Sequence, residues 1–353
     1  MTYQDLRREV QAAGLLDRSG WYSLPLALVT VVFGLASFAV LVTAPGAWRF
    51  AAVPLLSLFW IQIGFFGHDL GHKQVFPSSE RNRIVGIFCY PLLLGMTYRP
   101  WVIKHNLHHA DTNVEESDPD LQNPLLAFTE QAARERRGML RWLVRYQAYA
   151  YPFLALFATA GFRIDAWRYT LTGTTIYEQN EKYDRERRTE LVFLFGNLLL
   201  WLVIPTIALG PVTWLPVFVL GQMLLGLHMA FVFAPNHKGM PTFTEETRLT
   251  FLDQQVLTSR NVTGGPLVDF MYGGLNYQIE HHLFPTMPRQ NFPACRTIVQ
   301  RFCAEIALTY TEESVIQSFK SLFSSMDEIG QLVFEKRPLE AATVTGTAAT
   351  PQA

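Results

Sequence analysis

Four stretches of the chain are apolar and long enough to cross a lipid bilayer, and none of them contains Asp, Glu, Lys or Arg. They are residues 24–43, 50–67, 191–210 and 211–235. A spanning helix needs roughly 20 apolar residues. The whole chain agrees, since 49% of its residues are hydrophobic and only 17% are charged, against about 25% charged in a soluble domain. The sequence therefore predicts an all-α integral membrane protein rather than a large soluble protein with four charge-free core helices.

The four stretches form two pairs with short links, residues 44–49 and the break at Gly210-Pro211. Short links place both ends of each pair on one side, which predicts two transmembrane hairpins, 24–67 and 191–235. Lys and Arg gather on the cytoplasmic side of membrane proteins. The first link holds Arg49 alone and the second holds neither residue, whereas residues 68–189 hold 16. We therefore expect residues 1–23, 68–190 and 236–337 to be cytoplasmic, followed by a disordered tail, 338–353.

Two further apolar runs, residues 85–96 and 148–162, are short for a span, and they contain Pro91 and Pro152. We expect them to lie in the membrane interface or to dip into it.

Eight of the nine histidines fall into four compact groups. The groups are HDLGH at 68–72, HNLHH at 105–109, QIEHH at 278–282, and Asn236-His237 after the fourth stretch. Residues three and four apart share one helix face, and imidazole suits iron, copper, zinc and nickel. Eight imidazoles exceed the four ligands of one zinc site, so the pattern predicts two metal ions in one cavity. The ninth histidine, His228, lies on the opposite helix face from His237, and we expect it to be buried and hydrogen-bonded instead.

These motifs resemble those of the membrane-bound fatty acid desaturases. The resemblance includes HNLHHADTN followed by DPD, then APNH and GGLNYQIEHHLFP, and covers roughly residues 61–294. The Gln at the start of the third motif resembles the QxxHH motif of the family's front-end and acyl-lipid branch. The resemblance implies four transmembrane helices, a cytoplasmic helical cap holding two irons, and use of O2 to remove two hydrogens from a fatty acyl chain, giving a cis double bond.

The resemblance also implies the metal ligands, which are His68, His72, His105, His108, His109, His237, His281 and His282. Three roles stay open for Gln278: weak ligation, ligation through water, or a hydrogen bond alone. Asp69 and Glu280 stand beside ligands and are expected to orient imidazoles. Asn236 is expected to hold a water near one metal or to cap its helix.

Six further residues are singled out by the sequence. Asp118 and Asp120 match an acidic motif of the family, and we expect them to contact Arg or Lys in the cap rather than a metal. Gly273-Gly274 predicts a tight turn. Arg260 and Asn261 are typical of the family without a role that we derive.

The implied substrate is a fatty acyl chain linked to a lipid or to CoA, reaching the irons through an apolar tunnel among membrane lipids. The chain shows no G-x-G-x-x-G dinucleotide fingerprint and no HPGG haem-binding segment. We therefore expect an external electron donor, such as ferredoxin or cytochrome b5 with its reductase. The net charge of -1 argues against nucleic acid as a partner. A bacterial plasma membrane is the simplest expected location.

Three alternatives stand beside this prediction. A di-iron hydroxylase or ketolase acting on fatty acids, alkanes, sterols or carotenoids shares the iron chemistry and differs in whether the product keeps oxygen. A zinc protease needs H-E-x-x-H, whereas residues 68–72 carry Asp after the first His. A haem protein needs axial ligands inside the bilayer, whereas these histidines gather at its cytoplasmic end.

Overall fold

The computed structural model describes residues 1–18, 22–173, 184–247 and 249–335. Within these ranges, four helical segments are long and apolar enough to cross a membrane: Ser23–Thr43, Gly46–Gly71, Asp184–Leu209 and Pro211–His237. They contain the four stretches that the sequence predicts. The first and last are single helices, α2 (Ser23–Thr43) and α12 (Pro211–His237). The second joins η2 (Gly46–Ala51) to α3 (Ala52–Gly71), and the third joins α10 (Asp184–Leu198), η5 (Leu199–Val203) and α11 (Ile204–Leu209).

Helix α3 is the central element of this bundle, because it packs against α2 on one side and α12 on another. Trp60 on α3 and Trp214 on α12 are fully buried, and both pack in an aromatic cluster with Trp201 of η5 and with Phe218. The outer faces are apolar as well. In the most apolar 18 residues of α2, only 17% are buried, whereas 50% are buried in the corresponding stretch of the segment that contains α3. Apolar side chains on both faces are what a helix between protein and lipid requires.

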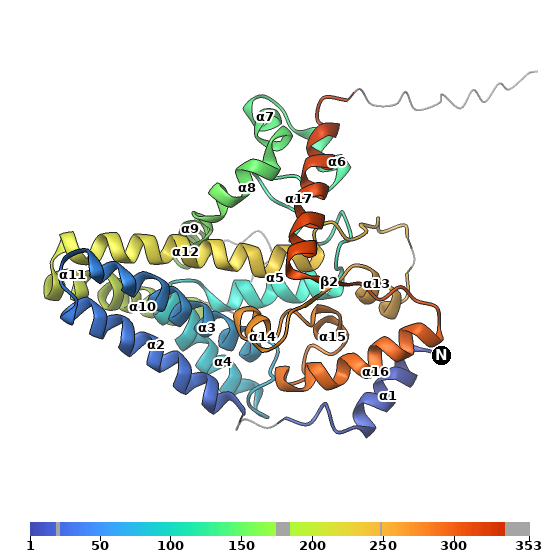
Figure 1. The fold of residues 1–353 in the computed structure, drawn as a ribbon, viewed down its shortest axis with the longest axis horizontal. Coiled ribbons are helices and arrows are strands. Elements are labelled where there is room, and N and C mark those ends of the chain that lie inside the picture. Colours follow the sequence, from blue (N-terminus) through green and yellow to red (C-terminus); the bar gives the residue numbers. More distant parts are fainter. Residues whose placement is uncertain (19–21, 174–183, 248, 336–353) are drawn as a thin grey trace, which may run out of the picture.

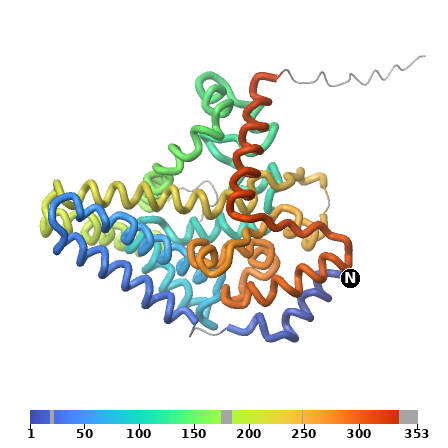
Figure 2. Tube along the Cα trace, viewed as in Figure 1, coloured from blue at the N-terminus to red at the C-terminus, as the bar shows by residue number. Residues whose placement is uncertain are grey.

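Short helices fill the segment between α3 and α10. They are α4 (Ser79–Ile87), the π-helix η3 (Phe88–Leu94), α5 (Tyr98–Ala110), α6 (Glu130–Glu135), α7 (Met139–Arg145), α8 (Gln147–Ala155) and α9 (Ala158–Thr172). The run 85–96 is divided between α4 and η3, and the run 148–162 between α8 and α9. Neither run forms a helix long enough to span a bilayer, as predicted. Together with α17, α7 and α8 project away from the long helices (Figure 2).

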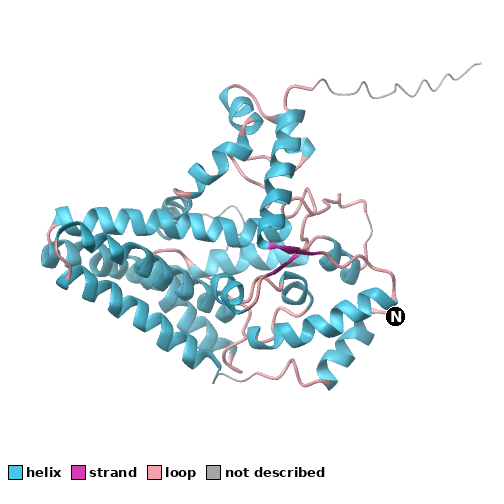
Figure 3. Cartoon of the chain, viewed as in Figure 1, coloured by secondary structure: helices cyan, strands magenta, loops and turns pink. Residues whose placement is uncertain are grey.

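The C-terminal part surrounds the ends of α3 and α12 that carry histidines. It comprises α13 (Phe251–Leu257), β1 (Asn261–Thr263), α14 (Pro266–Tyr272), α15 (Gln278–Leu283), η6 (Arg289–Asn291), α16 (Phe292–Glu305), β2 (Glu312–Ser314) and α17 (Val315–Leu332). The N-terminal helix α1 (Tyr3–Ala12) packs on α16. The strands β1 and β2 form a parallel pair (Figure 3). This pair corrects the all-α prediction: two three-residue strands, brought together by a crossover, leave no periodic pattern in the sequence.

Two glycines let bulky rings approach α3, the helix that carries the first histidine motif. A Cβ atom at Gly67 would lie 2.1 Å from the Tyr90 ring, and one at Gly71 would lie 2.5 Å from the Trp101 ring. Gly273 and Gly274 have φ values of 60° and 81°, in the left-handed region that favours glycine. They make the predicted tight turn before α15.

We predict that Gly67→Ala destabilises the protein by about 1–3 kcal/mol, the usual cost of overpacking a filled core. The control is Gly161→Ala, because no heavy atom lies within 4 Å of a Cβ built at that helical position. This control should be neutral or slightly stabilising, since Ala favours a helix over Gly by up to about 1 kcal/mol. The measurement is the thermal unfolding midpoint in detergent micelles, and equal midpoints for wild type and Gly67→Ala would contradict the prediction.

Candidate metal centre

Four helices deliver the eight predicted ligand histidines to one place. His68 lies in the last turn of α3 and His72 directly follows that helix, α5 carries the second motif, α12 ends on His237, and α15 carries the third motif. Their ring centroids lie close together, for example 4.8 Å between His68 and His281 and 4.6 Å between His237 and His282. Residues more than 200 positions apart are therefore neighbours, as the two-metal prediction requires.

The histidines separate into two groups of potential ligands. In the first group, one ring nitrogen from each residue lies within 4.8 Å of one from every other residue, and the same holds for the second group. The first group is His68, His72, His105 and His281, and the second is His108, His237 and His282. His109 lies between them, with ring centroids 4.6 Å from His72 and 4.1 Å from His282.

The chemistry of the cluster fits metal ions. Five buried imidazole nitrogens have no hydrogen-bond partner among the described residues: Nε2 of His72, Nδ1 of His109, both ring nitrogens of His281, and Nε2 of His282. A buried polar atom without a partner is costly, and a metal ion is the partner that several converging imidazoles share.

The electrostatics of the cluster also favour metal ligation. Burial lowers the pKa of four imidazoles outside the long helices well below its usual value, and neighbouring imidazoles lower it further. This applies to His105, His109, His281 and His282. Such rings stay neutral at pH 7, which leaves a lone pair for a metal.

Each ring of the second group has an acceptor at Nδ1. His108 Nδ1 lies 3.0 Å from Asp118 Oδ1, His237 Nδ1 lies 3.0 Å from the Thr258 carbonyl, and His282 Nδ1 lies 2.8 Å from Gln255 Oε1. These acceptors select the tautomer that donates from Nδ1 and leaves the Nε2 lone pair for a metal.

Asp118 is a functional position that the sequence analysis underestimated. Burial lowers the pKa of His108, but the carboxylates of Asp118 and Asp120 outweigh that effect and raise the pKa above its usual value. Asp118 therefore orients the His108 imidazole, which is the kind of role expected of Asp69 and Glu280. Asp120 behaves as predicted, since its carboxylate lies 2.6 Å from Lys104 Nζ.

Asp69 and Glu280 do not orient imidazoles. Asp69 Oδ2 accepts from Arg289 Nε at 2.6 Å, and His68 Nδ1 stays 4.0 Å from the nearer carboxylate oxygen. Glu280 accepts from the Tyr310 hydroxyl at 2.7 Å and from Asn261 Nδ2 at 2.8 Å. The reason is geometric, since adjacent helix positions point about 100° apart. These carboxylates instead tie the first and third motifs to the surrounding cap.

The side chain of Gln278 faces the second group. Its Nε2 lies 2.8 Å from His237 Nε2, and its Oε1 accepts from Asn236 Nδ2 at 3.0 Å. Asn236 also donates to the Leu275 carbonyl at 3.0 Å. Both donor hydrogens of Asn236 are thus used, whereas its Oδ1 is buried without a partner among the described residues, so the expectation that it holds a water stays a prediction.

The remaining positions occupy structural roles. His228 is hydrogen-bonded to the Met271 carbonyl at 2.8 Å and lies outside both groups, as predicted. Arg260 Nη1 donates to the Pro235 carbonyl at 3.1 Å, and Asn261 Oδ1 accepts from the Ile279 amide at 2.9 Å. Arg260 thus fastens the residue before β1 to α12, and Asn261 fastens the first residue of β1 to α15.

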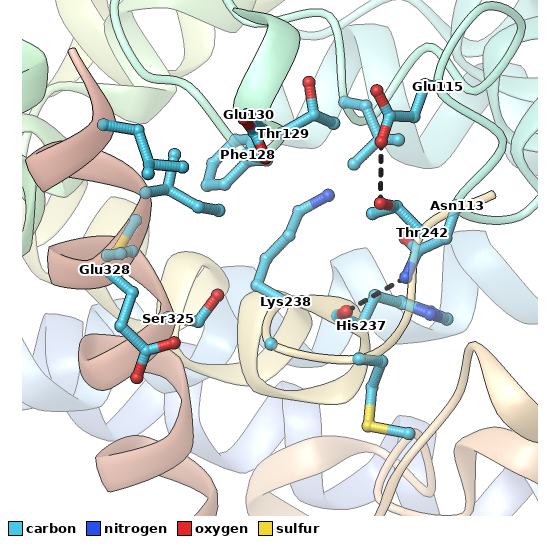
Figure 4. A pocket seen from close by; sticks show the side chains of 16 residues that line it. Asn113, Glu115, Phe128, Thr129, Glu130, His237, Lys238, Thr242, Ser325 and Glu328 are labelled. Carbon is cyan, nitrogen blue, oxygen red and sulfur yellow. Dashed lines mark hydrogen bonds between the residues drawn. The ribbon is translucent and has the colours of Figure 1, made fainter. Parts of the chain in front are cut away.

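A cavity of about 390 Å³ lies beside His237 (Figure 4). Lys238 extends into it, donates to the Asp120 carbonyl at 3.0 Å and lies 4.5 Å from the centroid of the Phe128 ring. Glu115 and Thr242 are among the polar side chains of the wall, and Leu121, Met326 and Ile329 are among the apolar ones. The lining is therefore mixed, and the expected apolar tunnel stays a prediction.

Fold and site together define a helical protein with four membrane-length helices and a buried histidine cluster suited to metal. Comparison with known families gives a match to the fatty acid desaturases over residues 45–314. The chain belongs to the fatty acid desaturase family, and it is an oxidoreductase of the acyl-lipid desaturase type.

Three curated relatives illustrate this membership. The Delta(6)-fatty-acid desaturase of Caenorhabditis elegans is 31% identical over 90% of this chain and 72% of its own length. The acyl-lipid (9-3)-desaturase of Physcomitrium patens is 31% identical over 81% of this chain, which spans 54% of that protein. The Delta(8)-fatty-acid desaturase of Euglena gracilis is 30% identical over 87% of this chain and 74% of its own length. These relatives are eukaryotic and give no support to the expected bacterial origin.

We predict that Gln255→Leu weakens metal binding by roughly 10–100-fold, the usual effect of removing the outer partner of a ligand histidine. Gln255→Glu keeps an acceptor for His282 Nδ1 and should retain metal. The measurement is metal per chain after dialysis against increasing chelator. Gln254→Leu is the control, because Gln254 donates to the Thr112 carbonyl and contacts no imidazole. If Gln255→Leu and Gln254→Leu release metal equally, Gln255 does not hold His282.

Proposed function

We propose that this protein introduces a cis double bond into a fatty acyl chain in an O2-dependent reaction at two iron ions held by the histidine cluster. The observation that carries this proposal is the set of five buried imidazole nitrogens without a partner among the described residues. The proposed ligands are the eight clustered histidines, with Gln278 facing the second ion. Membership of the family supports the reaction type.

The side chains have distinct tasks in this proposal. Neutral imidazoles offer lone pairs, while Asp118, Gln255 and the Thr258 carbonyl fix the tautomers of three rings. Bound iron with O2 supplies an oxidant strong enough to take hydrogen atoms from an unactivated methylene. Overall, the acyl chain gives up two hydrogens, a donor gives two electrons, two protons are taken up, and O2 leaves as two water molecules.

The donor and the acyl carrier are part of the proposal. We place the electron source outside this chain, in ferredoxin or cytochrome b5 with its reductase, because the sequence shows no dinucleotide fingerprint. The substrate is an acyl chain linked to a lipid or to CoA. The names of two relatives specify acyl-lipid and fatty-acid desaturation for those proteins, which supports a fatty acyl substrate here.

We predict that His282→Ala abolishes both iron binding and product formation, since it removes a ligand with a preset tautomer, whereas His228→Ala retains iron. The measurement pairs iron per purified chain with mass spectrometry of fatty acids from a host that lacks the activity. The wild type should produce an alkene. A mainly hydroxylated product would favour the hydroxylase alternative instead, and equal iron loss in both variants would refute the ligand assignment.

In the proposed topology, the four long segments form two hairpins with the histidine cluster at the cytoplasmic end. The Lys and Arg distribution supports this orientation. We predict that single cysteines placed at either terminus and within residues 115–130 react with a membrane-impermeant reagent only after the membrane is permeabilised. A cysteine at Gly46, which is exposed in the first link, should react in intact cells. Labelling of a terminus in intact cells would show the topology to be wrong.

A further inference from the structure

Glu190, on α10, is a fully buried acidic side chain outside the histidine cluster. A glutamate is almost never fully buried without a partner. The partners of Glu190 are two backbone amides of α5: Oε1 accepts from the Arg99 amide at 2.9 Å, and Oε2 accepts from the Tyr98 amide at 3.2 Å. A side chain of one long segment is therefore bonded to the beginning of α5, the helix that carries the second histidine motif.

The beginning of α5 needs such a partner because its own residues do not supply one. The first four amides of a helix have no acceptor within that helix. Within the described part of the chain, the residue before α5, Thr97, makes no side-chain capping bond, and the third residue of the helix, Pro100, has no amide hydrogen. Tyr98 and Arg99 carry the first two amides of the helix, and Glu190 accepts from both.

A second carboxylate on α10 reinforces this attachment. Glu186 lies one helical turn before Glu190, and one of its carboxylate oxygens lies 3.9 Å from Arg99 Nη1. The other oxygen of Glu186 lies 3.1 Å from Arg83 Nη1 on α4. The first turn of α5 is thus attached to α10 through its backbone by Glu190 and through a side chain by Glu186.

The histidine of α5 nearest to this attachment is His105, roughly 9 Å along the helix from Arg99. Its Nε2 lies 3.0 Å from His68 Nε2 and 3.2 Å from His109 Nε2. Its Nδ1 makes no hydrogen bond among the described residues, unlike the Nδ1 atoms of the second group. The ring instead stacks on Trp101 of the same helix, with centroids 4.9 Å apart and an interplanar angle of 17°. The position of His105 therefore follows from the position of α5.

We propose that Glu190 is a positioning residue for the first group of the metal centre. By accepting from the first two amides of α5, it fixes that helix against α10 and thereby holds His105 beside the other three histidines of the group. Ligands must be held within a fraction of an ångström of their productive positions, so a small displacement of α5 disturbs this group first. His108, on the same helix, has its own acceptor in Asp118 and depends less on Glu190. The inference rests on the proposed function, because it requires an iron ion at each group.

The test uses the full chain, loaded with the Mössbauer-active isotope of iron and purified in detergent micelles. Its two measurements need no turnover: iron per chain after dialysis against increasing chelator, and the Mössbauer spectrum. Wild type should show two iron signals of equal area. Glu190→Leu keeps a side chain of similar size and removes both acceptors. It should release one iron at an at least about tenfold lower chelator concentration, the lower end of the usual effect of removing a partner outside the ligands, and leave one iron signal.

Gln147→Leu is the matched control. Gln147 is also fully buried, and its side-chain amide bonds to the Ala127 amide, the Ala127 carbonyl and the Met326 carbonyl. These bonds attach α8 to a loop and to α17, which contain no histidine. Both variants should lower the thermal unfolding midpoint, but Gln147→Leu should keep both irons. Equal iron release by the two variants would show that Glu190 only stabilises the fold, which overturns the proposal.

Glu190→Gln guards against misfolding of Glu190→Leu, which gel filtration would reveal. Gln keeps one acceptor oxygen, so this variant should release one iron at an about threefold lower chelator concentration than wild type. Retention of both irons at the wild-type level by Glu190→Gln would overturn the proposal. A wild-type chain without iron would refute the proposed function and this inference with it, whereas two irons that Glu190→Leu retains like wild type would refute this inference alone.

Discussion

Eight imidazoles, six of them buried and two half-buried, are brought together by four helices and have too few hydrogen-bond acceptors among themselves to satisfy their nitrogens. His281 shows the problem most clearly, since both of its ring nitrogens lack a partner among the described residues. Burial also keeps such rings neutral, so repulsion between charges does not separate them. The arrangement is stable when metal ions take up the converging lone pairs. We therefore propose that the site where the ends of α3, α5, α12 and α15 meet depends on bound metal for its stability.

The surrounding cap fixes each motif by contacts that do not involve a metal. Arg289 ties Asp69, and with it the end of α3, to the segment after α15. Asn261 and Tyr310 donate hydrogen bonds to the Glu280 carboxylate on α15. Asn261 is the first residue of β1, and its position is fixed by the pairing of β1 with β2. A histidine cluster assembled from distant segments needs such rigid attachment, because ligands must be held within a fraction of an ångström of their productive positions.

The sequence predicts the elements that depend on local composition. The four apolar segments are recognisable because lipid demands long runs without charge, and the eight histidines because helical spacing puts them on shared faces. Contacts between distant segments leave no such signal. Gln255 lies on a separate helix, and nothing around it in the chain shows that it meets His282. Asp69 and Glu280 mislead for the same reason, since neighbours in sequence diverge on a helix, whereas Asp118, ten residues from His108, contacts it.

The central claim is that the histidine cluster holds two iron ions, and the most direct measurement combines metal analysis with X-ray absorption on the purified full chain. We expect two irons per chain. The iron-edge spectrum should show coordination mainly by imidazole nitrogen, with backscattering from the outer ring atoms. A single metal per chain, zinc in place of iron after iron-replete expression, or a spectrum with sulfur or porphyrin ligands would contradict it.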